Sequence, residues 1–152
     1  MKSIDISQWQ GKVDWSKIKD QVDFVIIKAS TGVNSPDKLV NENAKGAISS
    51  GVRFGFYHFA TLNNAQDPAG DAQMEAKYFD SIIRQYKTKF PPTIDIEENP
   101  SNLKPEQVLL YIKSFINTMK SLGYPRVMLY SYTPFLNQNL PSNHDLGSVP
   151  LC

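Results

Sequence analysis

Residues 23–29 read DFVIIKA, and this short apolar run decides the class of fold. A run that is apolar at nearly every position is typical of a parallel β-strand covered on both faces. Working outward from it, comparable strands are predicted at residues 3–7, 52–60, 92–97 and 126–132. The sequence therefore predicts at least five strands in one sheet.

Helices are predicted between these strands. Asp14 and the pair Asp67-Pro68 have the chemistry of helix starts, and Pro105 opens a further helix. Gly51 and Gly123 stand where a glycine commonly ends a helix. After Phe135 the sequence predicts a polar loop at 137–147, and residues 148–152 have the composition of a sixth strand beginning.

Strands that alternate with helices predict an α/β fold with a parallel sheet. The chain has 152 residues, which suits a single domain, residues 1–152. A doubly wound sheet fits this length well, whereas a (β/α) barrel usually needs about 250 residues. Length alone favours the doubly wound sheet, and the motifs described below favour the barrel.

Composition excludes several classes of protein. The net charge of +1 gives no basic stripe for nucleic acid, and the one cysteine, Cys152, cannot form an internal disulfide or a cysteine metal site. No apolar run approaches the roughly 20 residues of a membrane span. No secretory signal precedes the first strand, so we expect release by a holin-like route, by lysis or by non-classical export.

Asp95 and Glu97 are the most informative pair of polar residues. They lie at the end of the predicted strand 92–97, two positions apart, so both face one side of the sheet while Ile94 and Ile96 face the helices. Two carboxylates so close cannot both ionise freely, so one pKa should rise. A general acid and a neighbouring negative charge are what glycosidic bond cleavage needs.

A purely structural interpretation of the same residues stays open at this point. Asp95 and Glu97 could form salt bridges, or residues 97–99 could be a solvated loop, although Asp95 has no basic neighbour in its apolar strand. Asp5 could cap a turn, and His58 is expected to be a core residue. Lys28 could pair with the carboxylates, but we expect it to extend to the surface.

Aromatic residues accompany the carboxylates at the predicted strand ends. Tyr57, Tyr130 and Tyr132 could stack on sugar rings or fill the core, and Trp9 in the first loop could be a sugar platform or a packing residue. His144 lies in a polar loop and predicts nothing.

Taken together, these segments resemble the family 25 glycoside hydrolases, the Chalaropsis-type lysozymes of bacterial autolysins and phage endolysins. The resemblance covers essentially the whole chain and is carried, in order, by DISQWQG (5–11), VDW (13–15), FVIIKAS (24–30), FGFYHFA (54–60), PTIDIEE (92–98) and VMLYSY (127–132). It implies a TIM-like (β/α) barrel and N-acetylmuramidase activity on the β-1,4 bond between N-acetylmuramic acid and N-acetylglucosamine.

The resemblance also implies roles for single residues. Glu97 would be the general acid/base, Asp95 would orient the substrate's own 2-acetamido group as an internal nucleophile, and Asp5 would be a further acid at the barrel mouth. The aromatic residues would contact substrate at Tyr57, Tyr130, Tyr132 and Trp9. No metal and no cofactor are implied, and the expected partner is the glycan strand of bacterial peptidoglycan, with neither nucleic acid nor membrane.

Two departures from the family pattern qualify these expectations. Residues 29–32 read ASTG where family members often carry an acid, and the chain ends at residues 150–152, where the family's barrel continues. We therefore expect a barrel that is incomplete at its C-terminal end, with no separate wall-binding domain and with self-association through the open sheet edge.

Two other functions compete with a muramidase. A non-catalytic module that binds or assembles peptidoglycan would keep the fold without turnover, yet such a binder has no need of two crowded carboxylates. A flavodoxin-like binding protein would need a phosphate-binding loop after the first strand, and neither glycine-rich phosphate motif occurs.

Overall fold

A computed structural model describes residues 2–146 of the protein. Its centre is one parallel sheet of five strands in the order β1-β2-β3-β4-β5. The strands are β1 Ser3–Ile6, β2 Phe24–Thr31, β3 Phe54–Phe59, β4 Thr93–Asp95 and β5 Met128–Tyr130.

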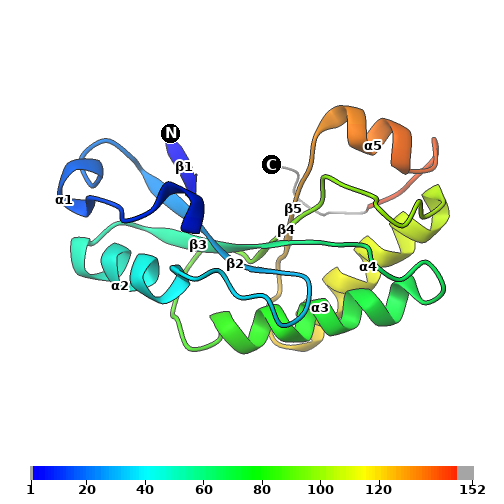
Figure 1. Ribbon diagram of the computed structural model, residues 1–152, viewed down its shortest axis with the longest axis horizontal. Helices are drawn as coiled ribbons and strands as arrows, with labels where there is room; N and C mark the ends of the chain where they lie inside the picture. Colours follow the sequence, from blue (N-terminus) through cyan, green and yellow to red (C-terminus); the bar gives the residue numbers. More distant parts are fainter. Residues whose placement is uncertain (1, 147–152) are drawn as a thin grey trace.

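The order of the strands distinguishes the two architectures. A doubly wound sheet reverses direction at a switch point, so that consecutive strands are not all neighbours. Here every strand pairs with its neighbours in sequence, and α2, α3 and α4 lie on the same side of the sheet (Figure 1). This is the arrangement of successive units of a (β/α) barrel, and the preference drawn from length alone was wrong.

The helices begin and end largely where the sequence predicts. Asp67 accepts a hydrogen bond from the Gly70 amide at 2.9 Å, and Gly51 adopts the left-handed conformation with φ of 70°. The helical segments are η1 Gln8–Gln10, α1 Trp15–Ile18, α2 Val40–Ser50, α3 Pro68–Ile83, α4 Pro105–Ser121 and α5 Thr133–Asn139.

The two faces of the sheet differ. The face under the helices holds the core, with the side chains of Val25, Ile27, Phe56, Ile94 and Leu129 all buried. Residues of the opposite, inner face are mostly half-buried. Alternation along each strand therefore sends one set of side chains into the core and leaves the other set for a site.

The structure corrects two boundaries. The predicted loop 137–147 begins within α5, because Pro134 suits a first helical turn and Phe135 is buried against the core. The predicted strand 92–97 is only three residues long as β4, so Glu97 lies beyond it. The predicted sixth strand at 148–152 lies outside the described residues, and within residues 2–146 no helix is long and apolar enough to cross a membrane.

A single aromatic ring closes the N-terminal end of the inner face. Phe90 stacks on Phe24 with ring centroids 4.6 Å apart. Gly55 makes room for it, since a Cβ at that position would come within 2.8 Å of the Phe90 Cβ. The inner face is thus filled at one end and leaves polar side chains at the other, where the strands end.

Candidate active site

The carboxyl ends of the strands bring the predicted site residues together. Asp95 is the last residue of β4, and its register partners are Phe59 on β3 and Tyr130 on β5. Tyr57 precedes Phe59 by two residues on β3, and its register partner on β2 is Lys28. Residues paired in register point to the same side of a sheet, so all five side chains belong to the inner face.

Glu97 is held next to Asp95 by backbone contacts with β5. The Ile96 amide donates to the Tyr130 carbonyl at 3.0 Å, and the Ser131 hydroxyl donates to the Ile96 carbonyl at 2.5 Å. Ile96 itself is fully buried. Glu97 therefore emerges on the side of Asp95, and the two side chains lie within hydrogen-bonding reach of each other.

Asp95 is the carboxyl whose pKa rises. Burial raises it most, the charges of Glu97 and Asp5 raise it further, and Lys28 opposes them, with the result that the pKa of Asp95 is about 8. Asp95 is therefore protonated near neutral pH.

Asp95 is not explained by a structural role. Its Oδ1 atom is buried and has no hydrogen-bond partner among residues 2–146. The other buried acids in α3 are engaged: Asp71 accepts from the Asn63 amide, Glu75 contacts His58, and Asp80 accepts from Tyr124. Buried carboxylate oxygens are normally paired, so an unpaired one at a strand end points to ligand binding.

Asp5 and Tyr57 extend the cluster across β1 and β3. Asp5 is exposed at the inner face, and its charge reaches both Tyr57 and Asp95. The pKa of Tyr57 lies far above its usual value because of burial and then because of the nearby acids, Asp5 first among them. The Tyr57 hydroxyl therefore stays protonated and serves as a neutral hydrogen-bonding group.

Lys28 does not extend to the surface, and that expectation was wrong. Its ammonium lies 4.8 Å from the ring centroid of Phe59 and 5.8 Å from that of Tyr57. Both rings come from β3, about thirty residues further along the chain, so no local pattern around Lys28 could indicate this position. The structure thus adds Lys28 and Phe59 to the site.

Two tyrosines border the carboxylates on the β5 side. Tyr130 and Tyr132 pack edge to face with centroids 5.9 Å apart. Glu97 is the main cause that raises the pKa of Tyr132 to about 12. Because Tyr132 is 53% exposed, its ring is available next to the pair.

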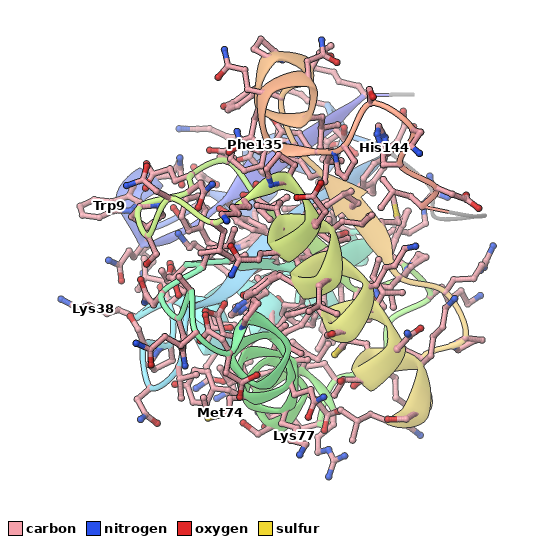
Figure 2. The ribbon with its side chains drawn as sticks, turned by 90° about the vertical axis from the view of Figure 1, so that its right-hand side faces the viewer. Trp9, Lys38, Met74, Lys77, Phe135 and His144 are labelled. Atoms are coloured by element: carbon pink, nitrogen blue, oxygen red, sulfur yellow. The ribbon has the colours of Figure 1, made fainter. Side chains whose placement is uncertain are left out.

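Trp9 lies on η1, which follows β1 at the other edge of the sheet from Tyr130 and Tyr132. It is 80% exposed, and Figure 2 shows its side chain projecting from the surface on the same side as Lys38, so it is not a packing residue. The turn beneath it is firmly held: the Gln8 amide donates to buried Asp37 at 2.9 Å, and the Ser7 amide to Gln10 at 2.7 Å.

His58 is a core residue, as predicted, and it belongs to a buried network behind the sheet. Its Nδ1 lies 2.9 Å from the Ser30 hydroxyl and its Nε2 2.7 Å from the Glu75 carboxylate. Glu75 also accepts from the hydroxyl of Thr61. Sequence patterns missed Glu75 and Asp37, because an acid in a helix or loop gives no sign of what it will contact.

The Nδ1 atom of His144 lies 2.8 Å from the Pro141 carbonyl oxygen. Within the described part of the chain, no group of three or more histidine, cysteine, aspartate or glutamate residues is arranged to hold a metal ion.

Comparison with known proteins places this architecture in a family. The sequence model of the Glycosyl hydrolases family 25 matches residues 4–151. The chain belongs to this family. It is 32% identical over 147 residues to Lysozyme M1 of Streptomyces globisporus, covering 90% of this chain and 48% of that protein. It thus spans about half the length of that relative.

Solved structures share the fold. A family 25 lysozyme from Aspergillus fumigatus superimposes with a TM-score of 0.82 at 26% identity, covering 99% of this chain and 73% of that one. The modular autolysin LytC from Streptococcus pneumoniae, solved with a synthetic peptidoglycan ligand, gives 0.79 at 28% identity, covering 91% and 34%. The fold is therefore the TIM-like α/β fold of the family 25 lysozymes.

Proposed function

We propose that this protein is a muramidase that hydrolyses the β-1,4 bond between N-acetylmuramic acid and N-acetylglucosamine in bacterial peptidoglycan. One observation carries the proposal: two carboxyls lie side by side at the open end of the sheet, and one buried oxygen of Asp95 has no protein partner in the described residues. Membership of a lysozyme family and the peptidoglycan ligand of LytC support this substrate.

In this proposal Glu97 donates a proton to the glycosidic oxygen as the bond breaks. Asp95 lies beside Glu97, within hydrogen-bonding reach of it, rather than facing it across a sugar ring as the second carboxyl of ordinary glycosidases does. The second carboxyl therefore acts through the substrate: Asp95 orients the 2-acetamido group, whose oxygen attacks the anomeric carbon. Water then opens the ring so formed, and Glu97 takes back a proton.

The remaining site residues bind the glycan. Tyr57, Tyr130 and Tyr132 line the cleavage point with hydroxyls and ring faces, and exposed Trp9 provides a stacking surface further along the strand. Asp5 adds negative charge that favours the positive transition state. We propose that the protein acts at the bacterial cell wall without a cofactor.

The deciding variant is Glu97→Gln, which keeps the shape of the side chain but cannot donate the proton. We expect wall lysis to fall by at least about a hundredfold, because a positioned general acid contributes 10²–10⁴-fold, while sedimentation with purified walls stays unchanged. Glu98→Gln, at the exposed neighbouring position, is the matched control and should remain active. Equal lysis by Glu97→Gln and the parent would rule out Glu97 as the acid.

Analysis of the released fragments tests the bond specificity. New reducing ends on muramic acid are expected after digestion of purified peptidoglycan. Reducing ends on glucosamine would indicate a different glycosidase, and binding to the wall without any release would indicate a non-catalytic peptidoglycan-binding module.

A further inference from the structure

Lys28 holds an unusual position for a lysine. Its side chain runs along the inner face of the sheet from the middle of β2, where it is half-buried rather than solvated. It forms no ion pair within 4 Å among residues 2–146. An ammonium that leaves bulk water without a carboxylate partner needs another source of stabilisation.

Two aromatic rings supply that stabilisation. The ammonium lies over Phe59 at 4.8 Å and near Tyr57 at 5.8 Å, within the range of cation–π attraction. Phe59 is the register partner of Asp95, so the rings seat the positive charge one strand away from the carboxyl pair.

The surroundings of this charge are otherwise acidic or neutral. The groups that surround the Asp95–Glu97 pair are Asp5 on β1, Tyr57 on β3, Tyr130 on β5 and Tyr132 after β5, while Asp37 in the β2–α2 segment acts on Tyr57. Among these groups Lys28 provides the positive charge. Its effect on Asp95 opposes burial and the other acids.

We propose that Lys28 is a positioning residue for the Asp95–Glu97 pair: its ammonium, seated over Phe59 and Tyr57 one strand away, offsets the negative charge that develops on Asp95. The catalytic consequence rests on the proposed muramidase function, in which Asp95 and Glu97 act side by side. Without Lys28 the pKa of Asp95 rises further, since its ionisation then occurs among acids alone.

Carboxyl NMR titration of ¹³C-aspartate-labelled protein tests this without requiring activity, with the Asp95 signal assigned by its loss in Asp95→Asn. Lys28→Met keeps the apolar stem and removes the charge. We expect its Asp95 midpoint about one pH unit above that of the parent, since a nearby opposite charge lowers a carboxyl pKa by about one or more. Lys28→Arg should restore the parent midpoint.

Two further variants separate charge from packing. Phe59→Leu retains the lysine but removes its closest ring, and should move the midpoint in the same direction by a smaller amount. Lys45→Met, at an exposed position on α2, should not move it. An unchanged midpoint in folded Lys28→Met would overturn the proposal.

The pH profile of wall lysis gives the second readout. In Lys28→Met the limb of the profile that follows the ionisation of Asp95 should shift to higher pH, which a purely structural defect would not produce. If the NMR midpoint moves but no variant or parent protein releases fragments, the electrostatic role of Lys28 stands and the muramidase proposal fails.

Discussion

Asp95 is buried at the edge of the sheet, and its negative charge is therefore costly to the folded state. Its pKa is about 8 in the folded chain against an ordinary 3.8. Between these two values the folded protein binds more protons than the unfolded chain, so stability is greatest at low pH in this window and falls as pH rises towards 8.

The variant Asp95→Asn should remove the loss of stability that occurs as pH rises towards 8. We expect its free energy of unfolding to exceed that of the parent by on the order of 2 kcal/mol at pH 8.5, with a much smaller gain at pH 5. Urea denaturation at both values measures the difference. Asp20→Asn, at an exposed position, is the control, and a gain independent of pH would contradict the assignment.

The position of the Lys28 side chain could not be predicted from the residues around it in the sequence. An apolar strand with a lysine near its end suggests a side chain that reaches for water, whereas the rings that hold it come from the next strand in the sheet. By contrast, the position of Asp95 on the inner face could be predicted from alternation along β4, whereas Glu97 lies beyond β4 and is held beside Asp95 by contacts with residues 130 and 131.

At the scale of elements, local chemistry predicted the helix ends well. Asp67 and Gly51 act through neighbours within four residues, so sequence alone contains the necessary information. The end of β4 was not predictable in this way: whether residues 96–97 continue the strand depends on contacts with β5. Helix α5 was missed because its apolar stripe is short, and burial of Phe135 stabilises it.

The buried link between β3 and α3 is expected to contribute strongly to stability. Burial would raise the pKa of Glu75, but its bonds to His58 and Thr61 outweigh burial and lower it. Glu75 therefore stays charged in the core. His58→Leu should cost about 3–5 kcal/mol in urea unfolding, since it removes one hydrogen-bond partner of the buried Glu75 carboxylate. His58→Leu/Glu75→Leu should recover part of that loss, and a further loss in the double variant would contradict the pairing.

Helix α2 packs closely on α1 at one glycine. A Cβ on Gly46 would lie 2.0 Å from the Trp15 indole nitrogen. Gly46→Ala should therefore lower stability by about 1–3 kcal/mol through overpacking, against the roughly 1 kcal/mol that alanine normally adds to a helix. Thermal unfolding measures the change, and Ser49→Ala on the same helix is the comparison. A higher melting temperature in Gly46→Ala would show that Trp15 moves aside freely.

At the scale of the whole molecule, the sheet has two edges within residues 2–146. Among the described strands, β1 pairs only with β2, and β5 only with β4. Unpaired strand edges favour association with another chain, so we propose that residues 1–152 self-associate. The general architecture was predictable because the βα alternation runs through the whole sequence, and the family resemblance implied a barrel, whose sequential strand order the five strands have.

Light scattering at micromolar concentration should show species larger than a monomer. Met128→Lys places a charge on β5 and should shift the distribution towards monomer, whereas Met74→Lys, on the exposed surface of α3, should not. A monomeric parent chain would contradict self-association through the sheet edge.

The chain has two tryptophans in unlike environments: Trp9 projects from the surface, while Trp15 lies against Gly46. This contrast means that intrinsic tryptophan fluorescence can report on the surroundings of Trp9. Added iodide should quench the emission of Trp9 far more than that of Trp15, and a bound sugar chain would shield the outer indole from the quencher. Binding of a sugar chain next to Trp9 could then be followed in real time without any label.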